Sequence, residues 1–392
     1  MIFSNLNNYT NKYLSINNLY IFLLIVICLL QILYAGKVDV NNYPPEHDIQ
    51  SYRRLALASP QIDYSVGRPF IYRFFTPWLV GFLFQNVDNG FLILNTLFLI
   101  VYVIIIYFFL LEYKVSPFIS FYLTIAFIFN RYFISYYAFE FYRLPDLISN
   151  SFLLLSIIFL KKQKYFILLI LSIIGVLSRE TALLIIPTGL AYIYFNGTRK
   201  HLILFVSYSI IIAFFYIIPR LTIYTPEGHS LLQAIIAYWK KIITPQAVIK
   251  QLFITFNPLF LIPVIQLKEF VTFNKKRLYL FILLIFTLLS SIFGGDMERL
   301  MMPYVPIYYL FIATIFQKFY ESGKINHIKM ILFVIICWLS NLYHLWGLIR
   351  LPSRVHSMVL TLIGGISILL LFIKLKTSLN DGNMQVNGLD KI

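Results

Sequence analysis

The chain has 392 residues, of which 60% are hydrophobic and 12% are charged, and its mean hydropathy is +0.80. Soluble domains carry about 25% charged residues, so this composition excludes a water-soluble fold. The net charge of +16 would suggest a nucleic-acid partner in a soluble protein. Here the lysines cluster between apolar runs, where retention of basic loops in the cytoplasm explains them, and we expect no nucleic-acid partner.

Hydrophobic runs recur along the chain and predict an all-α polytopic membrane protein. A bilayer core of about 30 Å needs about 20 apolar helical residues. With the N-terminus in the cytoplasm, twelve spans are predicted, at residues 19–36, 91–111, 117–135, 146–160, 165–178, 181–195, 201–218, 251–267, 278–293, 300–317, 329–347 and 356–373. Together they make one integral membrane domain over residues 1–392, with outer loops at residues 37–90 and 219–250.

The first outer loop begins with a proline pair, Pro44 and Pro45, that leads into a predicted interfacial helix. One face of this helix carries the apolar residues Ile49, Tyr52, Leu55 and Ala56. Glu46 and Asp48 lie in or just before its first turn. Such carboxylates can serve as a general base toward a hydroxyl group, but they can equally cap the helix and complement its dipole.

A second short apolar segment closes the same loop. Residues 74–85 are too few to cross a bilayer comfortably and contain Pro77, so they predict a re-entrant or interfacial helix. Arg68 and Arg73 precede this segment. They could hold a phosphate at the depth of the lipid headgroups, or bind anionic headgroups without specificity.

Two further charged motifs are predicted at the outer ends of spans. In the string RLPD, Arg143 and Asp146 are three residues apart, so we expect them to pair with each other. In the string SRET, Arg179 and Glu180 stand between two spans with almost no loop, and we expect both to face the helix bundle.

A last motif, GGDMER, contains Asp296 and Arg299 at the start of a span. The acid suits a helix N-terminus, but Arg299 opposes the helix dipole there. This conflict implies a nearby anion, such as Asp48 or the phosphate of a ligand.

The predicted topology places most arginines and most acids on the outer side and most lysines inside. Arginine presents a planar fork that suits phosphate and carboxylate groups, so this segregation indicates a binding site on the outer face. The alternative is a set of paired interfacial charges that stabilise short loops. The sequence contains no Walker A, dinucleotide-binding or esterase motif and no zinc-binding histidine spacing, so we expect neither metal nor cofactor.

In order, side and spacing these motifs resemble the GT-C superfamily of membrane glycosyltransferases, over most of the segment from Tyr43 to Pro306. Glu46 and Asp48 match the acidic pair of that superfamily's first loop. The resemblance implies a polyprenyl-phosphate-sugar donor, a glycan or lipid-linked acceptor, and inversion at the anomeric carbon. It further implies that Asp48 acts as the base with Glu46 as its helper, and that Arg299 and Arg179 bind the phosphate.

Two other readings stay open. A polymerase of O-antigen or capsule repeats would use arginines of residues 219–250 and would not need Asp48. A flippase or transporter of lipid-linked oligosaccharides would carry ionisable residues near mid-span. Abundant Ile, Phe, Asn and Lys suggest an AT-rich genome. We therefore expect the protein to lie in a bacterial inner membrane.

Overall fold

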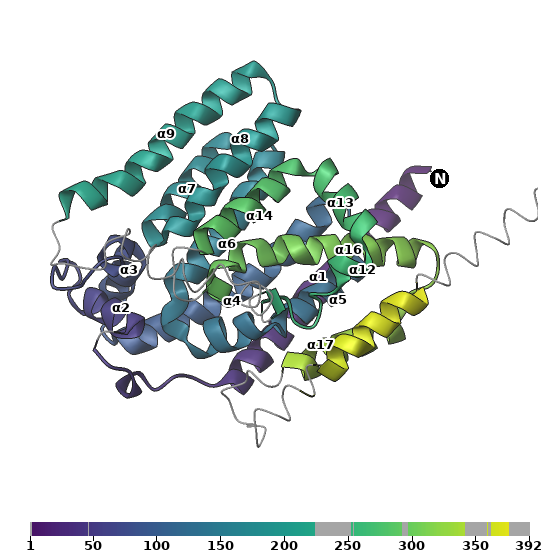
Figure 1. Ribbon diagram of the computed structural model, residues 1–392, viewed down its shortest axis with the longest axis horizontal. Helices are drawn as coiled ribbons and strands as arrows, with labels where there is room; N and C mark the ends of the chain where they lie inside the picture. Colours follow the sequence, from purple (N-terminus) through teal and green to yellow (C-terminus); the bar gives the residue numbers. More distant parts are fainter. Residues whose placement is uncertain are drawn as a thin grey trace, which may run out of the picture.

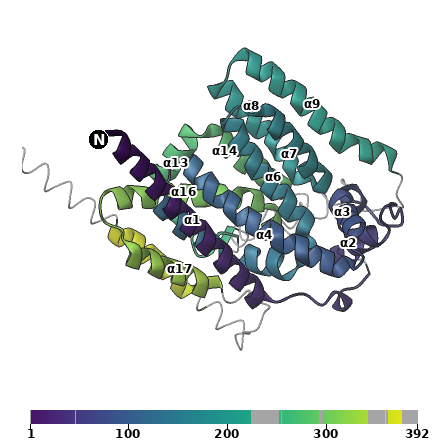
Figure 2. The same ribbon diagram turned by 180° about the vertical axis from the view of Figure 1, so that it is seen from behind.

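The computed structural model describes residues 2–45, 47–223, 252–253, 255–291, 297–341, 359 and 362–375. All regular elements within these ranges are helical, as the sequence predicts. Figure 1 shows the helices as a bundle, with α9 along one edge and α17 near the opposite edge. In Figure 2, from behind, α1 crosses the face of the bundle diagonally next to α4.

Four described helices are long and apolar enough to cross a bilayer. They are the segment 16–35 of α1 (Ile2–Ala35), α4 (Val87–Glu112), α6 (Leu144–Lys161) with the turn before it, and α9 (Arg199–Thr222). Because a helix rises 1.5 Å per residue, each reaches about 30 Å. The chain is therefore a membrane-embedded helical protein.

The remaining bundle helices are shorter. They are α5 (Pro117–Ile128), α7 (Tyr165–Ser178), α8 (Ile185–Asn196), α14 (Leu278–Ser291), α16 (Val305–Glu321), α17 (His327–Asn341) and residues 362–375. Most match a predicted span, and α7 has the predicted bounds. The total of twelve spans stays a prediction.

Two predicted spans are interrupted in the structure. The span predicted at residues 117–135 ends as α5 at Ile128, and after a turn the π-helix η3 (Tyr132–Phe139) follows. Residues 257–261 form turns inside the predicted span 251–267, and two shorter helices follow, α12 (Ile262–Ile265) and α13 (Leu267–Lys276). Pro258 and Pro263 have no backbone N–H to donate, so a continuous helix is interrupted there. The apolar composition of this segment had predicted one continuous helix and gave no sign of the interruption.

The bundle has two ends of different composition. At one end Lys161 approaches Glu112, with 3.6 Å between Nζ and Oε1, so the C-termini of α6 and α4 meet there. The N-termini of both helices lie at the opposite end, which also holds the first loop, because α2 packs against α4 there. We call the first the lysine end and the second the loop end.

The first loop folds as α2 (Asp48–Leu57), the 3₁₀ turn η2 (Phe70–Arg73) and α3 (Phe75–Leu83). All four residues of the predicted apolar face of α2 are buried, which confirms that prediction. The predicted short helix after Arg73 is also present as α3, and it packs between α2 and α4. These contacts fix the start of α2, and with it Asp48, against the bundle.

Replacing Gly81 by alanine is expected to destabilise the protein by about 1–3 kcal/mol, because overpacking forces backbone shifts. A Cβ at this position of α3 would lie 1.8 Å from the carbonyl oxygen of Ala56 in α2. Unfolding in detergent measures the cost. Gly67→Ala is the matched control, because a Cβ at Gly67 meets nothing within 4 Å and should change little. Equal costs for the two variants would contradict the close packing of α2 on α3.

Candidate functional site

Eight charged residues from segments far apart in the sequence meet at the loop end. They are Asp48, Arg73, Glu140, Arg143, Asp146, Arg179, Glu180 and Arg299. We call these residues the ion-pair cluster. Seven of them come from the charged motifs singled out in the sequence, so the structure brings most of the predicted site residues together.

Asp48 lies in the first turn of α2 but does not cap it. The N-cap is His47, whose Nδ1 accepts a hydrogen bond from the backbone N–H of Ile49 at 3.3 Å. Oδ2 of Asp48 instead accepts from Nη1 of Arg143 and, at 3.0 Å, from Nη1 of Arg299. The sequence conflict at Arg299 predicted a nearby anion, and its partner is Asp48.

The two arginines set the protonation state of Asp48. Burial alone would raise the pKa of its carboxyl group, but the charges and hydrogen bonds of Arg143 and Arg299 hold that pKa well below its usual range. Asp48 is therefore ionised and accepts hydrogen bonds only. A carboxylate held in this way is a weak base until its arginine partners are drawn elsewhere.

The expected pair between Arg143 and Asp146 is wrong. Arg143 binds Asp48 and, over 2.8 Å from Nε to Oε2, Glu140. Arg143 ends the 3₁₀ turn η4 (Phe141–Arg143), whereas Asp146 lies in the first turn of α6. The two residues therefore do not share one continuous α-helix, and the i,i+3 geometry does not apply.

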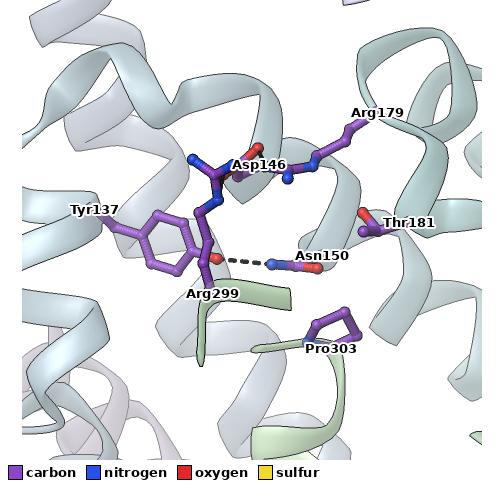
Figure 3. A pocket seen from close by; sticks show the side chains of 7 residues that line it. All are labelled: Tyr137, Asp146, Asn150, Arg179, Thr181, Arg299 and Pro303. Carbon is purple, nitrogen blue, oxygen red and sulfur yellow. Dashed lines mark hydrogen bonds and ion pairs between the residues drawn. The ribbon is translucent and has the colours of Figure 1, made fainter. Parts of the chain in front are cut away.

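Asp146 pairs with two other arginines, Arg179 and Arg299, which approach it from two sides in Figure 3. Nε of Arg299 is 3.8 Å from Oδ2, and Arg179 makes a closer contact. The side chains of Asp146 and Arg179 are each only 3% exposed. The expectation that Arg179 faces the bundle is thus confirmed.

A small cavity adjoins this pair. Its lining is Tyr137, Asp146, Asn150, Arg179, Thr181, Arg299 and Pro303 (Figure 3). About 10 Å³ of it can hold the centre of a water molecule, which is room for about one water. Asn150 donates to the hydroxyl of Tyr137 over 2.7 Å and so fixes one wall. This cavity is too small for a sugar, so a sugar needs a rearrangement to enter it.

Arg73 and Glu180 form the other arm of the cluster. Nε of Arg73 donates to Oε2 of Glu180 over 2.9 Å, and Nη1 reaches the hydroxyl of Tyr52 on α2 at 3.3 Å. Arg68 is exposed on the surface of the first loop. Glu46 and Asp296 lie outside the described residues, so the predictions made for them stay predictions.

Sequence reasoning missed two contributors. Glu140 accepts from Nε of Arg143, whose Nη1 binds Asp48, and its only sequence signal is its position three residues before Arg143. Asp88 accepts from Arg53 over 3.0 Å and from the hydroxyl of Tyr142, which ties α2 to the start of α4. No spacing rule links Asp88 to Arg53 or Tyr142, because these contacts depend on the packing of separate helices.

The stability of the protein is expected to fall as the pH falls from 7 to 3, in part through Glu180 in the turn between α7 and α8. Burial raises the pKa of Glu180, but Arg73 and Arg179 outweigh it and lower the pKa to about 2. A depressed folded-state pKa contributes stability that is complete above the unfolded value of about 4.3 and is lost as the pH falls toward the folded value.

Melting temperatures in detergent measure this effect. Glu180→Gln should be less stable than the wild type at pH 7, and the difference should shrink at pH 3. Glu321→Gln, at the exposed C-terminal end of α16, is the matched control and should leave the profile unchanged. A Glu180 variant whose deficit is the same at both pH values would show that the carboxylate charge does not stabilise the fold.

The cluster contains four arginines and four carboxylates, so its formal charges cancel. In the part of the chain that the structure describes, no group of three His, Cys, Asp or Glu side chains is placed to hold a metal ion. An added anion would therefore have to compete with a carboxylate for its arginines. No family model, curated protein or solved structure matches the chain, so the site is interpreted from its own geometry.

Proposed function

We propose that this chain is a membrane glycosyltransferase that moves a sugar from a polyprenyl-phosphate donor to a lipid-linked glycan or polysaccharide acceptor. The observation that carries the proposal is the carboxylate of Asp48, which Arg143 and Arg299 share where the first loop meets the bundle. This arrangement places a base next to anion-binding arginines at one end of the membrane helices. Sugar transfer from a lipid-phosphate donor requires both, a base for the acceptor hydroxyl and cations for the phosphate. The resemblance to GT-C enzymes and the prediction of twelve spans with an outer loop end agree with this proposal.

The proposed reaction is a direct displacement. The hydroxyl oxygen of the acceptor attacks the anomeric carbon of the sugar while the bond from that carbon to the phosphate oxygen breaks. Asp48 takes the hydroxyl proton, and the bond electrons leave with the polyprenyl phosphate. The new glycosidic bond lies on the opposite face of the sugar, so the anomeric configuration inverts. No step requires a metal or cofactor.

Binding of the donor would activate the base. Since the charges of the cluster cancel, the donor phosphate must replace a carboxylate at its arginines. Asp48 is a suitable one to be displaced, because its side chain is 24% exposed against 3% for Asp146. When Arg143 and Arg299 turn to the phosphate, the pKa of Asp48 rises and it becomes a stronger base.

Other cluster residues then have supporting roles. Arg179 is buried on Asp146, and Asp146 also approaches Arg299. The resemblance implies that Arg179 binds the phosphate, but because Arg179 is buried on Asp146, in this proposal it instead positions Arg299 through Asp146. Arg73 and Glu180 hold the end of the first loop against the turn after α7. Glu46 would orient the acceptor next to Asp48.

The proposal is tested by assaying sugar transfer in membranes that contain the full chain. The donors are a panel of polyprenyl-phosphate sugars and, in parallel, polyprenyl-pyrophosphate oligosaccharides. Transfer from a monophosphate donor supports the proposal. Polymerisation of only pyrophosphate-linked repeats would indicate the polymerase, and movement of a labelled lipid-linked oligosaccharide across the bilayer without any transfer would indicate the flippase.

A further inference from the structure

A groove lies at the lysine end, far from the ion-pair cluster. It runs between the N-terminal parts of α7 and α9 and has a volume of about 660 Å³. This volume falls within the range of about 300–1,000 Å³ that ligand pockets occupy. Helix α7 begins at this groove and ends next to Arg179 of the ion-pair cluster. Its 14 residues therefore separate the groove from the cluster by about 20 Å.

One end of the groove is basic. Arg199 and Lys200 begin α9 and are exposed, and His201 follows in the same turn. Nδ1 of His201 is buried without a hydrogen-bond partner among the described residues, while its ring lies against that of Tyr165 with 5.3 Å between centroids. The lining contains no acidic residue. This end therefore offers the positive charges of Arg199 and Lys200 to an anion, with His201 in the lining beside them.

Beyond the basic end the groove has an apolar side, formed by Ile203 and Leu204, and two uncharged polar residues, Gln163 and Ser207. Ile203 is 60% exposed, and Leu204 beside it is also exposed. Only 11% of the apolar window of α9 is buried, and Figure 1 shows this helix along the edge of the bundle. A ligand that fills the groove thus meets charge at one end and apolar side chains along its length.

We propose that this groove binds an anionic phospholipid. Its phosphate lies at Arg199, Lys200 and His201, and one acyl chain follows Ile203 and Leu204. Charge complementarity selects the anionic headgroup, since juxtamembrane basic residues attract such lipids. A free phosphate would leave the apolar side chains of Ile203 and Leu204 uncovered. A second copy of the chain in parallel orientation would bring two sets of these cations together. The site is independent of sugar transfer.

Native mass spectrometry of the full chain, released from detergent with phosphatidylglycerol or phosphatidylcholine, tests the proposal. The wild type should retain phosphatidylglycerol in preference to phosphatidylcholine. The double variant Arg199→Gln/Lys200→Gln should lose about tenfold in apparent affinity for phosphatidylglycerol, because each basic residue near the membrane surface contributes to binding. The matched control is Lys275→Gln/Lys276→Gln, which removes the same charge from exposed residues at the end of α13. It should bind as the wild type does.

Four results would overturn the assignment. Equal losses in the two double variants would show attraction to net charge rather than a site. Equal retention of both lipids would show that the headgroup is not recognised. Displacement of the lipid by millimolar inorganic phosphate, or a dimer that only the Arg199/Lys200 variant loses, would assign the groove to a free anion or to a second copy.

Discussion

Asp48→Asn is expected to lower the rate of sugar transfer by about 10²–10⁴-fold, the usual contribution of a general base. Asparagine keeps the shape of the side chain and can still accept a hydrogen bond, but it cannot take the proton of the acceptor hydroxyl. Transfer from the donor that the wild type uses, measured at saturating acceptor, gives the effect. A thermal melt of the purified variant shows independently that it is folded.

The same variant has a second signature that a purely structural role does not predict. Removing the charge of Asp48 leaves Arg143 and Arg299 without the carboxylate that they share. A phosphate then binds them without first displacing the carboxylate of Asp48, while Arg143 keeps Glu140 and Arg299 keeps Asp146. Polyprenyl phosphate should therefore bind Asp48→Asn about tenfold more tightly than the wild type, or about 1.4 kcal/mol. Slower transfer together with tighter donor binding identifies Asp48 as both base and competitor of the phosphate.

Asp63→Asn is the matched control, since Asp63 lies in the same loop and bonds locally to the hydroxyl of Ser65. It should change neither transfer nor donor binding. Undiminished transfer by a folded Asp48→Asn protein would remove Asp48 from the reaction. Slower transfer with weaker donor binding would instead mean that Asp48 only positions the two arginines.

Local sequence rules predicted the parts of the site that depend on one helix. The apolar face of α2 follows from residue spacing alone, and its four members are all buried. An anion was expected near Arg299, and Asp48 is there, but the reason given for it does not hold, because Arg299 lies in the last turn of α15 (Met297–Leu300) and not at the start of α16. The inference about α2 uses a physical demand of the segment itself, so it does not depend on knowing its neighbours.

Parts of the site that depend on several helices were beyond those rules. The pair expected between Arg143 and Asp146 assumed a continuous helix, but the turn before α6 directs Arg143 toward α2. Glu140 bonds locally to Arg143 and joins the cluster because Arg143 also reaches Asp48 of α2. Along the chain, the interruption at residues 257–261 shows that apolar composition does not locate a helix end when proline is present.

Asp146→Asn is expected to destabilise the protein by about 3–5 kcal/mol, because it leaves the buried charge of Arg179 without its partner. Both side chains are only 3% exposed, so water cannot replace the lost carboxylate. Unfolding of the purified variant in mixed detergent measures the cost. The comparison is Asp88→Asn, whose partner Arg53 is 34% exposed, and which should cost only about 0–1 kcal/mol.

A double-mutant cycle separates the pair from its surroundings. If the two charges stabilise each other, Asp146→Asn/Arg179→Gln should be less destabilised than the sum of the single variants, because no unpaired charge remains at that pair. A cost below about 1 kcal/mol for Asp146→Asn would mean that Glu180 alone compensates the charge of Arg179. The cluster would then be held by its outer members, and Asp146 would not position Arg299 for the donor phosphate.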